Sequence, residues 1–264
     1  MPVILYGQSA ALCKSSFKKY LGGAIDGSII FGSPVSDFLK DYVKSETKAA
    51  QSLTTKKIEK KDYAEDINDD GLIDYITNIK NNSDVMSAEL ENMQLEMTTL
   101  NGAVSTSNEE INRVKEHSGN NIDSSFLRHI CQKLAIPVGT FSEQVHGHVS
   151  VISDSWAKVE NNYLALLDSN YLDSSNIESI SESLTSLTGL KKAIEGSNKN
   201  ISSFIDSIQI CLGMERRLNI SINSLISEMT SYLELTDSMS SSVDRIVNKG
   251  NITTNKIMHN GLTN

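Results

Sequence analysis

A short acidic stretch holds the residues whose types and spacing come closest to a known site chemistry. Asp66, Asn68 and Asp70 alternate along it and Gly71 follows, which matches the first, third, fifth and sixth positions of an EF-hand calcium loop. The loop curls around the ion and needs hard oxygen ligands at alternating positions. The twelfth position, however, is Thr77 in place of a bidentate Glu. Because Asn, Asp and Gly also form ordinary turns, we expect a helix-capping turn, weak calcium binding at most, and no other cofactor.

The sequence contains no catalytic motif. His146 and His148 form its close histidine pair, and residues two apart on a helix point to different faces. Cys13, Cys131 and Cys211 are too far apart for a zinc motif and do not indicate a disulfide framework. None of these residues has a neighbour whose spacing would assist proton transfer or orient a nucleophile. The sequence therefore predicts a protein that is not an enzyme.

Charge and hydropathy narrow the range of partners. A net charge of −9 disfavours nucleic acid, which is recognised by basic surfaces. No run reaches the roughly 20 apolar residues of a membrane helix, so any membrane contact is expected to be indirect. The first residues lack the basic and apolar regions of a cleaved signal peptide. We expect protein partners, for a chain that is either cytoplasmic or secreted without a cleaved signal peptide.

Two long apolar patterns dominate the rest of the chain, each with alternating spacings of three and four. Such a pattern makes a narrow apolar stripe on a helix that packs against another helix. The first apolar stripe comprises Met86, Leu90, Met93, Met97, Leu100, Val104, Ser107, Ile111 and Val114. The second apolar stripe comprises Ile201, Phe204, Ile208, Cys211, Glu215, Leu218, Ile222, Leu225, Met229, Tyr232, Thr236, Met239, Val243 and Ile246.

These stripes predict an all-α fold: an elongated helical bundle with a long antiparallel coiled-coil hairpin. Its two helices are expected at about 84–117 and 200–248. A hydrophobic content of 39% and an aromatic content of 6% favour such a thin core over a thick globule. Residues 1–80 are predicted to form an N-terminal arm with short helices, and residues 81–264 the coiled-coil bundle with short central helices at 118–200.

Local signals set the expected helix ends within the bundle. Asn81 to Asp84 offer N-cap residues for the first long helix. Pro137 and Gly139 are expected to stop a helix over 124–135 before another spans 141–168. The polar tail after Lys249-Gly250-Asn251 is expected to fray.

Two stretches carry a family resemblance. The first runs through Gly189 to Ile194, Asn198 to Asn200, Ile208 to Ile210 and Leu218 to Leu225; the second joins Glu65 to Ile67 with Leu72 to Ile76. Together they resemble segments of the needle-tip and filament proteins (hydrophilic translocators) of bacterial type III secretion. The resemblance implies an acidic, soluble protein that is exported without a cleaved signal and built on a coiled coil between a central and a C-terminal helix. The three cysteines and the polar residues 251–264 depart from the family pattern.

The resulting functional hypothesis is a non-enzymatic assembly protein, most concretely an exported, self-assembling component of a host-contact apparatus used in virulence. Met239, Val243 and Ile246 near the end of the second stripe are its expected interaction residues. Deletion of residues 240–264 would then abolish assembly and leave most of the helical signal. The alternatives are a soluble component of a helical pore-forming toxin and a cytosolic or phage coiled-coil scaffold.

Overall fold

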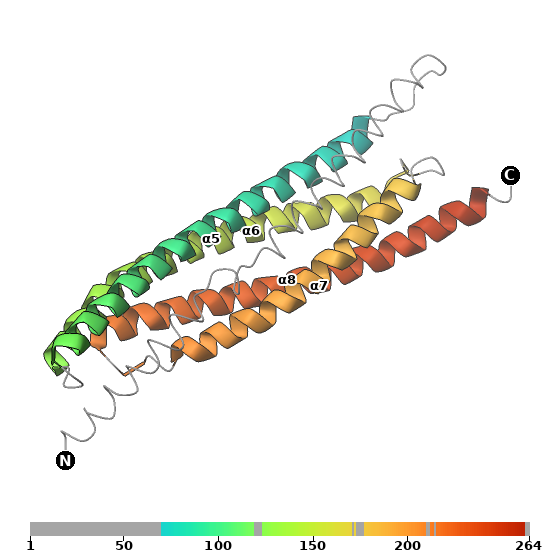
Figure 1. The fold of residues 1–264 in the computed structure, drawn as a ribbon. Helices are drawn as coiled ribbons and strands as arrows, with labels where there is room; N and C mark the ends of the chain where they lie inside the picture. The colour runs from blue at the N-terminus through green and yellow to red at the C-terminus, as the bar shows by residue number, and fades with distance from the viewer. Residues whose placement is uncertain are drawn as a thin grey trace. The chain divides into compact units, whose positions relative to one another are not determined.

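A computed structural model describes residues 70–118, 123–170, 172, 177–209, 212–213 and 215–261. They form the helices α5 (Asp70–Ser118), α6 (Ser124–Asp168), α7 (Ile177–Gln209) and α8 (Arg216–Gly261) (Figure 1). Helix accounts for 96% of this described part and no strand occurs in it, so the all-α class is confirmed. The arm and short helices predicted for residues 1–80 lie outside the described residues, apart from residues 70–80, which belong to α5.

The described residues fall into two compact units. Unit 1 takes its residues from 90–150 and 197–234, and unit 2 takes its residues from 70–89, 151–196 and 235–261. Each of the four helices contributes one part to unit 1 and another part to unit 2. Because residues 1–69 are not described, the predicted domain division after residue 80 stays a prediction.

The first apolar stripe is buried. Its residues from Met86 to Ser107 are at most 5% exposed, while Ile111 and Val114 are half-buried. The N-cap predicted at residues 81–84 is wrong, because α5 runs through this segment without a break. Ser83 is fully buried there, and its Oγ donates a hydrogen bond of 2.8 Å to the carbonyl of Ile79. A polar residue that bonds to its own helix in this way does not end it.

The second apolar stripe is shared by two helices, so the single helix predicted over 200–248 is wrong. α7 ends at Gln209 and α8 begins at Arg216. Gly213 between them has a φ of +95°, a left-handed conformation that glycine adopts without strain. Glu215, a polar member of the stripe, then caps α8: its Oε2 accepts hydrogen bonds from the backbone N–H of Arg217 (2.7 Å) and Leu218 (3.1 Å). From Leu218 to Ile246 the stripe is again buried.

α6 is one continuous helix, and the predicted stop at Pro137 and Gly139 is wrong. A proline inside a helix removes one backbone hydrogen bond and costs ~3 kcal/mol. Tertiary contacts oppose this cost, because Leu134 and Val138 on either side of the proline are 2% and 4% exposed. In addition, Ser221 of α8 donates a hydrogen bond of 2.8 Å to the carbonyl of Ala135.

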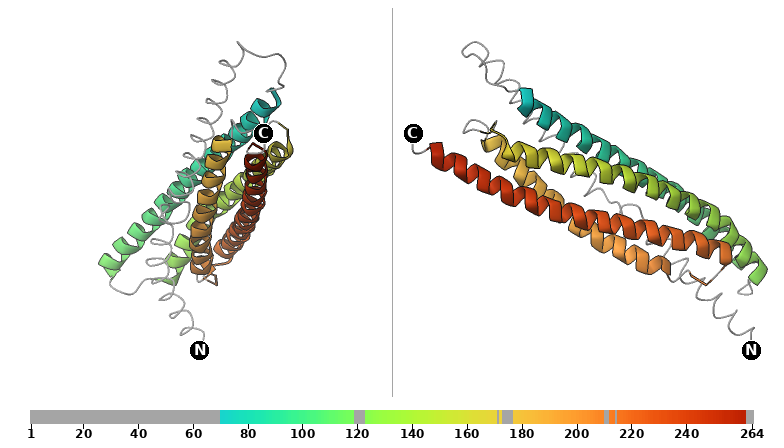
Figure 2. Two further views of the ribbon diagram at one scale, coloured as in Figure 1. Left: turned by 90° about the vertical axis from the view of Figure 1, so that its right-hand side faces the viewer. Right: turned by 180° about the vertical axis from the view of Figure 1, so that it is seen from behind.

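Contacts between helices give their directions within each unit. In unit 1, Ser142 bonds to Ser224 and His146 bonds to Glu228, so residue numbers rise together along α6 and α8. In unit 2, Glu160 pairs with Arg245 and Asp168 pairs with Lys249, so residue numbers again rise together along the two helices. α6 and α8 therefore lie side by side and run parallel in each unit (Figure 2). The predicted hairpin of α5 with α8 is not tested by these contacts and stays a prediction.

The predicted fraying after residue 249 is wrong, because α8 continues to Gly261. Gly250 is buried against α7. A Cβ atom placed on Gly250 would lie 2.5 Å from Cδ1 and 2.6 Å from Cδ2 of Leu184, which is itself 5% exposed. This glycine therefore permits the close approach of α7 and α8 in unit 2.

We expect Gly250→Ala to destabilise the protein by about 1–3 kcal/mol, because the added methyl group overpacks the contact with Leu184. Gly147→Ala is the matched control. Nothing lies within 4 Å of a Cβ at Gly147, so this change should stabilise α6 by about 0.5–1 kcal/mol. Urea unfolding of both variants measures the difference. A Gly250→Ala protein as stable as the Gly147→Ala protein would contradict the close approach.

Candidate functional site

The possible calcium loop, for which the sequence predicts weak binding at most, lies mostly outside the described residues. Asp66 and Asn68 lie outside the described residues, and Asp70 is the first residue of α5. Within the part of the chain that the structure describes, no three His, Cys, Asp or Glu side chains are grouped so as to hold a metal ion. The weak calcium site therefore stays a prediction.

The interaction residues predicted near the end of the second stripe belong to the core of unit 2. Met239, Val243 and Ile246 are 5%, 1% and 0% exposed. The same spacing that suggested an interaction surface buries these side chains within their own chain. They could reach a partner only if α8 left the core, so their interaction role stays a prediction.

The two histidines of α6 contact different helices, as their spacing predicts. His146 Nδ1 lies 3.0 Å from Glu228 Oε2 of α8, and His148 Nε2 lies 2.8 Å from Glu96 Oε2 of α5. Cys131 is buried in the core of unit 1 and is 3% exposed. The structure thus separates the three side chains that a search for catalysis would select.

Small side chains bring α6 and α8 close together in unit 1. Ser221 Oγ donates to the carbonyl of Ala135, and a Cβ atom at Gly139 would lie 3.2 Å from the same Oγ. The hydroxyl groups of Ser142 and Ser224 are 2.8 Å apart and share a hydrogen bond. Because little side-chain bulk separates the two backbones, residues beside the contact point outward from both helices.

Two isoleucines project beside this contact. Ile136 of α6 is 73% exposed, and Ile220 of α8 is 63% exposed. Successive helix residues are about 100° apart, Ile136 follows Ala135, and Ile220 precedes Ser221 on a parallel helix. Both side chains therefore lie on the same side of the contact, away from the core. We call this pair the outer apolar patch of unit 1.

Charged residues accompany the outer apolar patch. The same helical geometry places Arg217 of α8 and Glu143 of α6 on this side of unit 1, and both are exposed. Arg217 lies one turn before Ser221, whereas Glu143 lies one turn after Gly139, so the two charges are at opposite ends of the patch. An apolar centre with charges around it is the usual composition of an interaction surface.

Sequence reasoning missed the outer apolar patch because it followed the two stripes. Ile220 falls midway between the stripe residues Leu218 and Ile222, which places it on the opposite side of the helix. Ile136 is next to Pro137, where a helix end was expected. The sequence signal that could have revealed this patch is a large apolar residue on the polar side of an amphipathic helix.

The start of α8 is also tied to α6. Gln132 Nε2 lies 3.5 Å from Oε1 of Glu215, the cap of α8. Burial by itself would raise the pKa of the Glu215 carboxyl, but the hydrogen bonds from Leu218 and Arg217 favour the charged form, and the net pKa is lowered. Glu215 is therefore held as a carboxylate at the beginning of the helix, where a negative charge is favourable.

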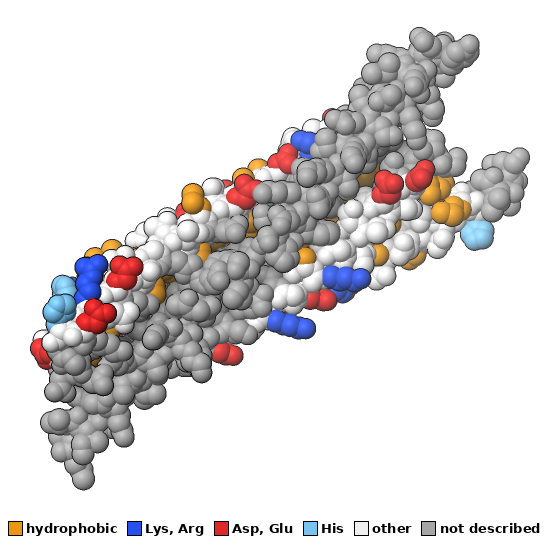
Figure 3. All heavy atoms as spheres, in the orientation of Figure 1, with side chains coloured by type: hydrophobic (Ala, Val, Ile, Leu, Met, Phe, Trp, Pro, Cys, Tyr) orange, Lys and Arg blue, Asp and Glu red, His pale blue; other side chains and the backbone are white. Residues whose placement is uncertain are grey.

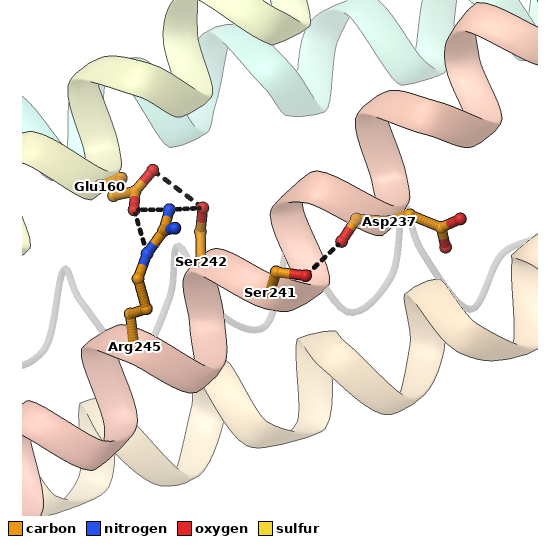
Figure 4. Close-up of polar contacts among 5 residues, drawn as sticks. All are labelled: Glu160, Asp237, Ser241, Ser242 and Arg245. Atoms are coloured by element: carbon orange, nitrogen blue, oxygen red, sulfur yellow. Dashed lines mark hydrogen bonds and ion pairs between the residues drawn. The ribbon is translucent and has the colours of Figure 1, made fainter.

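Unit 2 is rich in polar contacts between helices. Glu160 of α6 accepts hydrogen bonds from Ser242 Oγ (2.8 Å) and Arg245 Nε (3.2 Å) of α8, as Figure 4 shows. Lys191 of α7 pairs with Asp244 of α8, and this hydrogen bond raises the pKa of Lys191 above its usual value. These pairs are satisfied within the chain, and we assign them to packing.

Buried aromatic groups complete the core. The Tyr163 hydroxyl lies 2.7 Å from Ser183 Oγ, which joins α6 to α7 in unit 2. Trp156 is 3% exposed, and its Nε1 has no hydrogen-bond partner among the described residues. Burial raises the pKa of Tyr232 far above its ordinary value, so this phenol stays neutral. Trp156 thus serves as a core residue, as its surroundings of Val and Ile suggest.

The surface charges and the similarity of the chain to known proteins give few further indications of function. Among the described side chains on the face in Figure 3, acidic and basic groups are interspersed without a large area of one sign. Among the described helices, none is long and apolar enough to cross a membrane. Comparison of the chain with sequence models of protein families, with curated proteins and with solved structures finds no match.

Proposed function

We propose that this chain is a non-enzymatic interaction protein that assembles with further copies of itself through the outer apolar patch of unit 1. The exposure of Ile136 and Ile220 on one side of the contact between α6 and α8 carries the proposal. Exposed apolar groups that are gathered on one face and bordered by polar residues mark interaction surfaces. Each isoleucine would contribute about 1.5–3 kcal/mol if a partner buried it fully.

A second copy of the chain suits this surface because its charges are self-complementary. Arg217 and Glu143 lie at opposite ends of the patch. A two-fold axis through the patch, perpendicular to the helices, reverses the second copy and brings its Glu143 to the end where Arg217 of the first copy lies. Such an interface uses the same residues on both copies, as most homodimers do.

Substitution of both isoleucines tests the proposal. Ile136→Gln/Ile220→Gln should keep the fold, since both sites are exposed and Gln is a good helix former, but should weaken self-association at least tenfold. Leu95→Gln is the matched control: Leu95 is 67% exposed on α5 of the same unit and outside the patch. Analytical ultracentrifugation across a range of concentrations measures the association constants. A monomeric wild type, or equal association of the double variant, would contradict the proposal.

The cellular setting that we propose is export as a needle-tip or filament component of a type III secretion apparatus. The support for this finer proposal is the sequence resemblance through Gly189 to Ile194 and Leu218 to Leu225. Comparing the chain in the culture medium of cells with a working apparatus and cells without one tests the setting. Equal amounts in both media would count against export by this route.

A further inference from the structure

Small residues adjoin the two isoleucines of the outer apolar patch. Ile220 and Ser224 of α8 are four residues apart, so Ser224 lies one turn further along the same side of the helix. Ser224 is exposed, and its short side chain is bonded to Ser142, whose hydroxyl lies 2.8 Å away. Gly139 follows Ile136 of α6 by three residues and has no side chain. The patch thus carries long apolar side chains at one level and short side chains about one turn beyond it.

The charges at the two ends of the patch give the position of the two-fold axis described above. The bond between Ser142 and Ser224 places residues of α8 level with residues 82 positions earlier on α6. At this offset Arg217 lies eight residues before the level of Glu143. An axis that brings Arg217 of one copy to the level of Glu143 of the other therefore crosses α6 midway, at Gly139. The other contacts between these helices in unit 1 have offsets of 82 to 86, which moves the axis by at most about half a turn.

This axis places Ile220 of the second copy beside Ser224 of the first. It crosses α8 at Ser221, one residue after Ile220, and the rotation reverses the direction along the helix. Ile220 of the second copy is therefore carried to a level midway between Ile220 and Ser224 of the first copy. With a rise of about 1.5 Å per residue, about 3 Å along the helix separate it from either residue. The short side chain of Ser224 leaves space at this level, and the two-fold symmetry repeats the contact.

On the basis of the self-association proposed above, we propose that Ser224 determines whether the second copy fits. Its short side chain leaves the space that Ile220 of the other copy fills, so shape selects the partner together with charge. A larger apolar residue at position 224 would add apolar surface, but it would occupy this space. Specific fit and nonspecific apolar attraction therefore make opposite predictions for such a change.

Of the two small residues, Ser224 is the one that can be enlarged with little effect on the core. It is exposed, and substitutions at exposed sites usually change stability only slightly. A Cβ atom at Gly139, in contrast, would lie 3.2 Å from Ser221 Oγ, so even a methyl group there presses on α8. The test therefore substitutes Ser224 and leaves Gly139 unchanged.

Ser224→Leu and Ser224→Ala test the fit in the full chain. Both variants lose the hydroxyl that bonds to Ser142, and they differ from each other only in the size of the side chain. We expect Ser224→Leu to weaken self-association at least tenfold, and Ser224→Ala to stay within about threefold of the wild type. Analytical ultracentrifugation measures association, and circular dichroism with urea unfolding at high dilution measures folding. Ser224→Gln, which adds bulk with a good helix former, should weaken association as Ser224→Leu does and replaces it if that variant does not fold.

A mixture of two single variants tests whether the contact joins position 224 of one copy to position 220 of the other. In a mixed pair of Ser224→Leu with Ile220→Ala, the enlarged side chain meets the shortened one, and the second contact keeps its native residues. We expect this mixed pair to be at least about tenfold tighter than the Ser224→Leu homodimer and tighter than the Ile220→Ala homodimer. Energy transfer between copies labelled at their N-termini with two different dyes measures the pairing.

The outcomes separate this inference from the proposed function. If Ser224→Leu associates as tightly as the wild type or more tightly, or if the mixed pair is no tighter than both homodimers, Ser224 does not determine the fit. Self-association through the patch still stands in that case, provided that Ile136→Gln/Ile220→Gln weakens it. A monomeric wild type overturns both proposals.

Discussion

Deletion of residues 240–264 is expected to unfold the helices of unit 2. The deleted segment holds Val243 and Ile246, which are at most 1% exposed, and each contributes about 1.5–3 kcal/mol through burial. It also holds the partners of Glu160, Asp168 and Lys191. Since domains are stable by only about 5–15 kcal/mol, losses of this size remove most of the stability. The sequence pattern alone predicted that the helical signal would survive.

Circular dichroism and hydrogen exchange measure the effect of this deletion. The helical signal should fall by more than the deleted residues account for, and peptides from 151–168 and 177–196 should lose protection. Deletion of residues 262–264 is the control, because α8 ends at Gly261. If α6 and α7 keep their protection in the longer deletion, the packing of α8 in unit 2 is wrong.

Phe141→Ala is expected to give the largest effect of any single truncation in unit 1. Phe141 is 1% exposed and is a large, fully buried side chain of α6. Removal of a buried Phe costs about 3–5 kcal/mol, from lost burial and from the cavity that remains. Ile136→Ala, five residues earlier on the exposed side of the same helix, should change the stability of the monomer, measured at high dilution, by less than about 0.5 kcal/mol. Thermal and urea unfolding of the two variants should differ accordingly; equal losses would mean that the buried and exposed sides of α6 are misassigned.

Apolar spacing alone predicts the class of this fold and much of its core. The residues from Met86 to Val104 are buried where a spacing of three and four places them, and those from Leu218 to Ile246 are buried in the same way. Such periodicity is a property of the whole helix, so isolated polar members such as Thr236, 4% exposed, do not disturb it.

Helix ends were harder to predict, because local signals compete with tertiary packing. Ser83 resembles a cap but bonds within α5, and Pro137 resembles a stop but lies between buried residues of α6. Conversely, Gly213 and Glu215 do separate α7 from α8, although the apolar spacing continues almost unchanged across them. Local sequence signals determine a helix end only where tertiary packing does not oppose them.

The outer apolar patch could not be predicted from the two apolar stripes, because neither stripe contains Ile136 or Ile220. Ile136 and Ile220 lie on the same side of one contact only because Ser221 approaches Ala135 and Gly139 across two parallel helices. That pairing joins residues 86 apart in the chain, and no local pattern contains it. The histidine contacts are of the same kind: their spacing predicts different directions but does not identify Glu96 or Glu228.

The parallel course of α6 and α8 constrains the order in which the chain can fold. Their contacts join residues 81 to 86 positions apart, with α7 in between. Closing so long a loop costs chain entropy before any contact forms, and contacts of large sequence separation slow folding. During synthesis α6 leaves the ribosome well before α8 is made. The side of α6 that α8 covers therefore stays exposed to water until then. Antiparallel neighbours that are close in sequence, such as α5 with α6 and α7 with α8, can meet first, and the contact between α6 and α8 then closes last.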